Sequence, residues 1–500
     1  MLGNILAMVI VIPALSGNTR VFGIYSIVTS LTMYLGYADL GIINAGQKLA
    51  AEAYVNRERR REEEILGFVV MVLLIGVGLF ITVAILLSLF PMVLSRNLAE
   101  RDSADIASSL LRLTSLSAAA VIFQRFNAIM YGARLKQYIV QRTEVALSMS
   151  KLAVIPLFFG SNSYNVVGYY GFCGSVSVVA AFGLCVFGSR SFGVSLLSIF
   201  HYVRFSRAMF NRAAPMTLNG IFLMVTWIAY YELDAIYIGH VFGVREVAIY
   251  SVGFSILSLT RSMFAILFSP LSTRLVYFHA EGHRQQLANY LVYVSRVTLP
   301  IIVIPICVAF VMMPTIVIAW VGSGFLESIS VARVLVLCNA LGFIAYPMGA
   351  WLFVTEQLRH SYLAAGLALV AFGALSIALL APLGFKAFAV GKLGAFITMG
   401  VYYTSLLVRH LKLDVGKLLE YYVLPLVLPV LVLISAGILI QSEAGSGEQS
   451  GLAAAAVKCC ILAIAASGVL LIQGRFYREQ AVRMLCAAFN RPLQAACEVK

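Results

Sequence analysis

The sequence predicts an all-α protein that crosses a membrane many times, and composition is the first observation behind this prediction. Of the 500 residues, 61% are hydrophobic and 12% are charged, whereas soluble domains have about 45–50% apolar and roughly 25% charged residues. The mean hydropathy is +0.93. This composition excludes a disordered chain, a disulfide-rich secreted protein and a nucleic-acid-binding protein, so no nucleic-acid partner is expected.

The second observation is the length of the apolar runs, each bounded by charges or by clusters of Gly, Ser and Asn. A membrane-spanning helix needs about 20 residues, but a barrel strand only about 9–11. Backbone groups in lipid must be paired within helices or closed barrels, and these runs have the length of helices. Fourteen spans are expected, at residues 1–15, 23–47, 66–94, 104–130, 140–161, 167–188, 213–241, 248–273, 290–320, 329–356, 361–382, 386–408, 420–440 and 452–473.

The third observation is the distribution of Lys and Arg among the connecting segments. Alternate segments hold 24 of them and the opposite set holds five. The positive-inside rule then places both termini in the cytoplasm and requires an even number of spans. Residues 1–15 are short for a span and lack the basic region of a signal peptide, so a first helix whose beginning is missing is expected.

An internal repeat sets the expected domain organisation. Phe22-Gly23-Ile24-Tyr25-Ser26 opens the second span and Val247-Ala248-Ile249-Tyr250-Ser251 opens the eighth, each after a glycine-containing polar turn. This offset maps six spans onto the next six as parallel repeats. We expect two six-helix bundles around a central cavity. The segments are an N-terminal bundle (1–190), an interfacial connector (191–212), a C-terminal bundle (213–410), helices 13–14 (411–475) and a cytoplasmic tail (476–500).

Charged residues inside the spans are the first candidate site residues, because a charge at the bilayer centre has to face protein or water. Arg261 lies near the middle of the eighth span, and Asp39 on the repeat-related second span is its expected counter-ion. Arg112 and Lys151 are further cations within spans. Basic residues nearer span ends are expected to extend to the headgroups; these are Arg125, Arg333, Lys392 and Lys458.

Two acidic residues in the outer part of the seventh span have two open interpretations. Glu232 and Asp234 lie beside Tyr230, Tyr231 and Tyr237. They form either a functional acidic site or a structural cap of the helix end against Arg245.

Several motifs with a known chemistry are absent or weak. The chain has no GxxxxGK[ST] phosphate loop, and its cysteines form no CxxC pair. The sequence at 279–283, HAEGH, contains a helix-disfavouring glycine, so neither a metal nor any other cofactor is expected. The run of charges at 57–64 is interpreted as a solvated face. The outside loops are too short for a catalytic domain, so no enzymatic activity is expected.

Several of these segments together resemble a known family of transporters. They are the glycine turn with Phe22-Gly23-Ile24-Tyr25-Ser26, then Ala38-Asp39-Leu40-Gly41, then Glu232-Leu233-Asp234-Ala235-Ile236-Tyr237 ahead of the second repeat motif. With the number of spans, this pattern is similar to the polysaccharide-exporter, or Wzx-type O-antigen flippase, family of the multidrug/oligosaccharidyl-lipid/polysaccharide (MOP, MATE-like) superfamily. The shortened first span departs from that family, in which the corresponding helix lines the cavity.

The resemblance implies that the chain moves an undecaprenyl-diphosphate-linked oligosaccharide across a bacterial inner membrane, for lipopolysaccharide, O-antigen or exopolysaccharide biosynthesis. Expected partners are this lipid-linked substrate, membrane lipids, a polysaccharide polymerase and a chain-length regulator. A basic cavity suits a diphosphate. We expect Arg261 to contact it first, with Arg112 and Lys151 behind. Four tyrosines either contact sugars or pack against other helices: Tyr34, Tyr37, Tyr230 and Tyr231.

Two alternatives remain open at this point. A cation-coupled multidrug (MATE-type) antiporter of the same fold would need a net acidic cavity for its cationic drugs. A scaffold of envelope assembly that transports nothing would tolerate the loss of Arg261.

Overall fold

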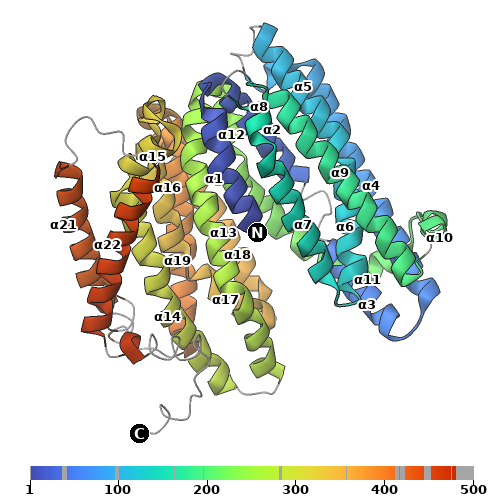
Figure 1. Ribbon diagram of the computed structural model, residues 1–500. Coiled ribbons are helices and arrows are strands. Elements are labelled where there is room, and N and C mark those ends of the chain that lie inside the picture. The colour runs from blue at the N-terminus through green and yellow to red at the C-terminus, as the bar shows by residue number, and fades with distance from the viewer. Residues whose placement is uncertain are drawn as a thin grey trace. The chain divides into compact units, whose positions relative to one another are not determined.

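The computed structural model describes residues 2–35, 42–95, 101–160, 164–194, 196–280, 284–355, 357–411, 416, 420, 423–443, 452–474 and 476–479. Over these residues the chain forms α-helices with a few 3-10 and π-helical segments, and none of them lies in a strand (Figure 1). The predicted all-α class is therefore confirmed for the described part of the chain.

The chain divides into two compact units, residues 1–251 with 383–385, and residues 252–382 with 386–500. This division falls inside one long helix, α13 (Val244–Ala280). The boundaries of the two bundles that the repeat predicts stay a prediction.

The first unit contains helices at every span expected there. They are α1 (Leu2–Ser16), α2 (Thr19–Leu35), α3 (Ile42–Val55), α4 (Arg59–Leu89), η1 (Pro91–Val93), α5 (Arg101–Ser117), α6 (Ala119–Gly132), α7 (Gln137–Ala153), α8 (Ile155–Phe158), α9 (Val166–Phe192), α10 (Leu196–His201), α11 (Arg207–Trp227), η3 (Ile228–Glu232) and α12 (Asp234–Val241).

The second unit begins within α13 and continues the helical pattern. It contains α14 (Arg284–Val311), α15 (Met313–Val321), η4 (Ser323–Phe325), α16 (Ser328–Gly342), α17 (Ala345–Val354), α18 (Leu358–Leu383), α19 (Ala387–Leu411), α21 (Leu424–Glu443) and α22 (Leu452–Gln473). The short η5 (Gly384–Lys386) joins α18 to α19.

Eight helical stretches of the described chain are long and apolar enough to cross a membrane, or nine if one bent pair counts as a single span. The protein is thus a multi-pass membrane protein, while fourteen spans stay a prediction. Part of the difference arises because some expected spans are broken into shorter helices. The span expected at 140–161 contains α7 and the short α8, and the chain breaks at Val154, just before Pro156, which cannot continue a helix. In addition, the spans expected at 361–382 and 386–408 fall within a single stretch, Leu358–His410.

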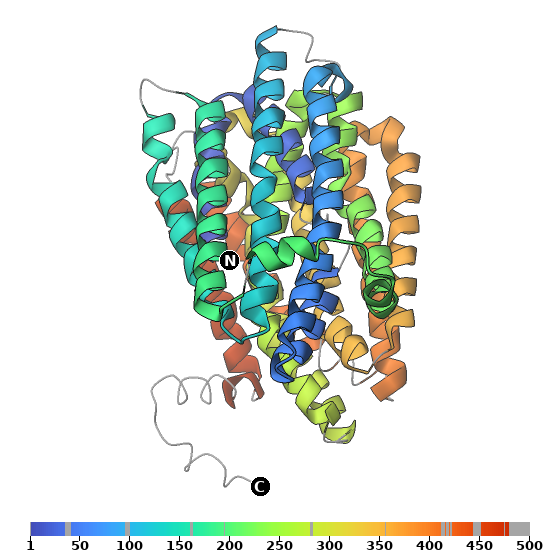
Figure 2. The ribbon, with the colours of Figure 1, turned by 90° about the vertical axis from the view of Figure 1, so that its right-hand side faces the viewer.

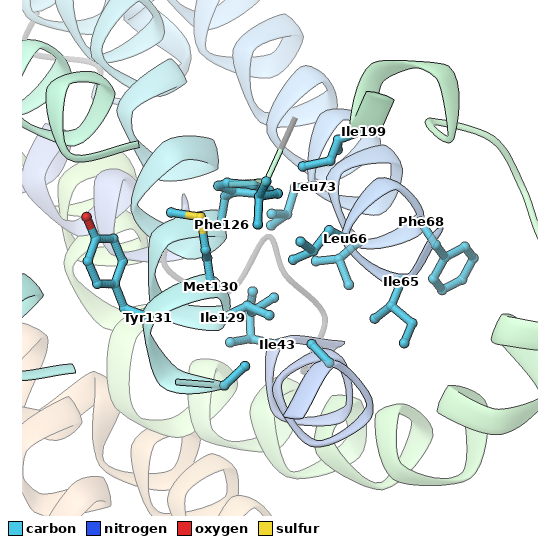
Figure 3. Packing of buried hydrophobic residues seen from close by; sticks show 14 of the residues in the cluster. Ile43, Ile65, Leu66, Phe68, Leu73, Phe126, Ile129, Met130, Tyr131 and Ile199 are labelled. Atoms are coloured by element: carbon cyan, nitrogen blue, oxygen red, sulfur yellow. The ribbon is translucent and has the colours of Figure 1, made fainter. Parts of the chain in front are cut away.

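In the first unit, a hydrophobic cluster joins α3, α4 and α6 to the segment expected to be a connector. Leu66, Ile129 and Met130 are fully buried, and Ile199 of α10 packs into the same cluster (Figure 3). A Cβ atom on Gly67 would lie 2.6 Å from the Tyr202 carbonyl oxygen. The glycine therefore lets the connector backbone pass directly over α4.

Beside this cluster, one residue of the charged run is buried instead of solvated. Glu62 pairs with Arg134 at 2.6 Å, with side chains only 6% and 5% exposed. The Arg134 guanidinium also lies over the rings of Tyr54, at 4.7 Å, and Phe192, at 4.9 Å. The expectation of a solvated face is wrong at Glu62, because this carboxylate neutralises a buried guanidinium.

In the second unit, α13, α16 and α19 pack closely at small residues. A Cβ atom on Gly253 would lie 3.0 Å from the backbone of Ala332, and one on Gly342 would lie 2.4 Å from the ring of Phe396. Small residues at such crossings let membrane helices approach each other. In the same unit, α21 and α22 pack on α14 through a separate cluster that includes Val308, Leu433, Leu462 and Tyr477.

Candidate functional site

The chain bends by 42° between α11 and α12, inside the seventh predicted span. The break is the π-helical turn η3, closed by a 3.2 Å hydrogen bond from the amide of Leu233 to the carbonyl oxygen of Ile228. A π-turn inserts an extra residue into a helix and is frequent at functional sites. In membrane transporters, broken helices often carry the binding groups.

The two acidic candidates lie on either side of Leu233, at this break. Glu232 is 6% exposed and Asp234 is 3% exposed. Asp234 begins α12 and accepts hydrogen bonds from the amide of Ala235, at 3.1 Å, and from the hydroxyl of Tyr250. A carboxylate is stabilised at a helix N-terminus, so these contacts give Asp234 a structural role in holding the break together.

The tyrosines of the break are packing residues in this conformation. Tyr231 is fully buried and stacks on Trp227 with ring centroids 4.3 Å apart. Tyr230 is 3% exposed and meets the same indole edge-on at 5.4 Å. Contact of either ring with a sugar would require the break to open.

The tyrosine candidate on α2 lies near a polar cluster that the sequence did not reveal. Tyr34 is partly buried. Thr32 is two residues before Tyr34 on α2, and its hydroxyl lies 3.0 Å from the hydroxyl of Tyr170 on α9. The Tyr170 hydroxyl also lies 2.9 Å from the hydroxyl of Thr114 on α5. These three hydroxyls join α2, α5 and α9 inside the first unit. In the sequence, only the hydroxyl groups of these residues hinted at such a cluster. Thr and Tyr fit into apolar helices without interrupting their hydrophobic pattern, so the cluster could not be located from the sequence.

Arg112 lies on an exposed polar stripe of α5. The exposed residues Asp102, Asp105, Arg112 and Leu116, with the partly exposed Ser109 between them, follow the spacing of one helix face. The other faces of α5 pack against α2, α4 and α9, which lie beside it (Figure 2). Three charges on one face are costly in hydrocarbon.

The neighbouring helix α4 shows the opposite pattern. Its exposed residues are apolar along most of its length, and Ile75 and Leu79 are 65% and 66% exposed. This face suits acyl chains, whereas the α5 stripe requires water or a polar ligand. The first unit therefore has one helix with a lipid-type surface and one with a water-type surface.

Lys151 and Arg261 are both partly buried, in different units. Lys151 lies in the last turn of α7, where a cation interacts favourably with the helix dipole. Arg261 lies near the middle of α13, as expected for a midplane residue. It follows Thr260, whose hydroxyl accepts a 2.5 Å hydrogen bond from the Asn339 amide of α16.

The structure corrects the interpretation of Lys392, which was expected to extend to the headgroups. Its side chain is fully buried, and its ammonium lies 4.4 Å from the ring centre of Phe254 on α13. Phe254 and Arg261 are seven residues apart, so they share a face of α13 about 10 Å apart along its axis. The second unit thus presents two cations to one side of this helix.

Two of the predicted site residues, Asp39 and Tyr37, lie outside the described residues, so the pairing of Asp39 with Arg261 stays a prediction. Most of the HAEGH sequence lies outside them too. In the described ranges, no group of three or more His, Cys, Asp and Glu side chains could hold a metal ion.

The sequence matches no protein-family model and no curated protein, but solved structures resemble it in fold. One is an inward-facing multidrug resistance MATE family transporter of the MOP superfamily, at TM-score 0.62 and 14% identity, which covers 82% of this chain and 94% of its own. Another is the lipid II flippase MurJ, at TM-score 0.63 and 14% identity, covering 93% and 98%. The chain has the fold of these two transporters.

The likeness covers most of this chain and nearly the whole of each of the two solved structures. A third structure, a MATE protein in a bent conformation, matches at TM-score 0.52 and 13% identity. At such identities the agreement is one of fold, and the substrate has to be argued from the side chains of this chain.

Proposed function

We propose that this chain is a MOP-superfamily flippase of the Wzx type, which moves an undecaprenyl-diphosphate-linked oligosaccharide across a bacterial inner membrane by alternating access. The observation that carries the proposal is the placement of cations within the membrane helices. Arg112 lies on the polar stripe of α5. Arg261 belongs to α13, and Lys392 lies over Phe254, seven residues before Arg261 on that helix. The proposed role is transport, with no chemical step.

A diphosphate makes such cations useful. Moving this anion through a medium of low dielectric is strongly unfavourable unless positive groups accompany it. Guanidinium groups also bind phosphate oxygens through paired, charge-assisted hydrogen bonds. We therefore propose that Arg261 contacts the diphosphate first and that Arg112 and Lys151 act behind it, with Asp39 as the counter-ion of Arg261 in the empty state.

The oligosaccharide requires a different surface. Tyr34 and Tyr37 are the proposed sugar contacts on the first unit, while Tyr230 and Tyr231 would take part only when η3 opens. We propose that the chain works together with a polysaccharide polymerase and a chain-length regulator as partners, and that both of its termini lie in the cytoplasm.

A cation-coupled multidrug antiporter is the second candidate, and one observation favours it. Glu232 and Asp234 are buried at a helix break, where carboxylates could bind a coupling ion. Against it, Asp234 is already held by Tyr250 and Ala235.

Complementation of a deletion strain tests the proposal. Arg261→Ala is expected to leave surface polysaccharide unrestored at normal expression, whereas the exposed Arg57→Ala restores it. Full rescue by Arg261→Ala would remove this residue from the mechanism and favour a scaffold that transports nothing.

A parallel measurement of resistance to cationic drugs separates the second candidate. A multidrug antiporter would raise resistance, and Glu232→Gln would abolish that gain. A flippase leaves resistance unchanged and still exports the glycan.

A further inference from the structure

A pocket of about 300 Å³ lies in the second unit between α14, α21 and the segment that follows α22. Arg296 of α14 enters it together with Phe476 and Tyr477, and its apolar walls include Leu424 and Leu470. None of these residues belongs to the candidate translocation site. The pocket therefore requires an explanation of its own.

Charge is the first property that selects an occupant. Arg296 is the only residue with a formal charge among the described residues that line the pocket. Its guanidinium carbon lies 4.0 Å from the centre of the Phe476 ring, a cation–π contact that fixes the orientation of the group. The pocket thus prefers an anion.

The second aromatic residue leaves this charge in place. Tyr477 is 6% exposed and belongs to the hydrophobic cluster of α14, α21 and α22. Burial raises the pKa of the Tyr477 phenol, and the nearby Arg296 only partly opposes this effect. The phenol is therefore neutral at physiological pH and does not neutralise Arg296.

The walls are the second property that selects an occupant. Leu424, at the beginning of α21, is 62% exposed, and Ile472, at the end of α22, is 84% exposed. Further along α21, Leu431 and Ile438 are also exposed. An apolar surface continuous with a cationic pocket matches an amphiphile whose anionic group enters the pocket and whose chain follows the helices.

Size excludes a large polar head. The volume lies at the lower end of the range for small-molecule pockets, about 300–1,000 Å³. It accommodates a phosphate with its ester groups but not an oligosaccharide.

We propose that this pocket binds an anionic glycerophospholipid, with its phosphate on Arg296 and an acyl chain along α21. Basic pockets between membrane helices are a known kind of site for anionic headgroups. Bound lipid would tie α21 to α14 and stabilise the folded second unit through mass action.

The test uses the purified full-length protein and two probes, dioleoyl phosphatidylglycerol and dioleoyl phosphatidylcholine, with bound lipid counted by native mass spectrometry. The wild type is expected to bind the anionic lipid on the order of tenfold more tightly, as one charge-assisted contact implies. Arg296→Gln should remove this preference. The matched control is Arg478→Gln, because Arg478 is exposed and lies outside the pocket lining.

Two further arms keep the proposal falsifiable. Leu424→Trp fills the pocket while leaving Arg296 in place and should also weaken binding of the anionic lipid, even if Arg296→Gln fails to fold. Inorganic phosphate at millimolar concentration should not displace the lipid, because it gains nothing from the apolar walls. An unchanged lipid preference in both pocket variants, or displacement by phosphate, would overturn the proposal.

Discussion

The hydroxyl of Tyr250 donates a hydrogen bond to the carboxylate of Asp234, the first residue of α12. Tyr250 belongs to the second repeat motif, and Asp234 belongs to the segment that resembles the flippase family. The two sequence features are thus parts of one structural device. It joins the beginning of α13 to the break in the seventh predicted span, and both residues lie in the first unit.

Tyr250→Phe should destabilise the protein and loosen this break. The change removes a hydrogen bond to a charged group, which contributes about 1.5–3 kcal/mol, and leaves a buried carboxylate with one partner fewer. The measurement is the melting temperature of the purified protein in detergent. Tyr237→Phe is the control, since Tyr237 is 45% exposed, and a similar loss in that variant would contradict the role given to Tyr250.

A cysteine at position 112 should react with a water-soluble, membrane-impermeant maleimide. The α5 stripe carries charges and must be hydrated, and a thiol reacts through the thiolate form that water favours. The background is a chain whose eight native cysteines are replaced. In that background Leu79→Cys, on the apolar exposed face of α4, should stay unlabelled. Equal labelling at both positions would refute the assignment of the two faces.

Glu62→Gln should lower the free energy of unfolding by about 3–5 kcal/mol, because it leaves the guanidinium of Arg134 buried beside an uncharged partner. Chemical denaturation in detergent measures this. The matched control is Glu64→Gln. Glu64 lies 3.4 Å from the guanidinium of Arg60, whose side chain is 81% exposed, so the loss of this ion pair should change the free energy of unfolding by less than about 1 kcal/mol. Equal effects of the two substitutions would mean that burial of the Glu62 pair does not matter.

Much of the fold could be predicted from sequence, because length and hydropathy in a membrane leave few structural solutions. The all-α class and the position of a helix in each expected span follow from the apolar runs alone. Breaks within spans were harder to predict. At η3, Trp227 stacks on Tyr231. Glu232 and Asp234 mark this region as polar, but the apolar and aromatic residues before them give no sign of where the hydrogen bonds shift from an α to a π pattern.

The candidate site was less predictable for a related reason. Lys392 is only five residues into α19, and closeness to a helix end suggested that its side chain extends to the headgroups. Its burial depends on Phe254 of another helix, a contact that no local pattern encodes. Arg112 could be identified as polar but not as exposed, because that property depends on which faces of α5 its three neighbours cover.

Gly23→Ala should separate α2 from the beginning of α13 and destabilise the first unit. A Cβ atom at position 23 would lie 2.0 Å from the carbonyl oxygen of Val244, and backbone cannot rotate away as a flexible side chain can. Overpacking of this kind costs about 1–3 kcal/mol or more. The loss should appear as a lower melting temperature, since the same contact positions the helix that carries Tyr250.

Gly78→Ala provides the matched control, because no atom lies within 4 Å of a Cβ atom at that position on α4. Alanine is the better helix former by about 0.5–1 kcal/mol, so this variant should be neutral or slightly more stable. Destabilisation by both substitutions would point to a general need for glycine flexibility in these helices. If only Gly23→Ala lowers the stability, the cause is the close approach of α2 to the backbone of Val244. This approach then explains why the first repeat motif has glycine at the position where the second has Ala248.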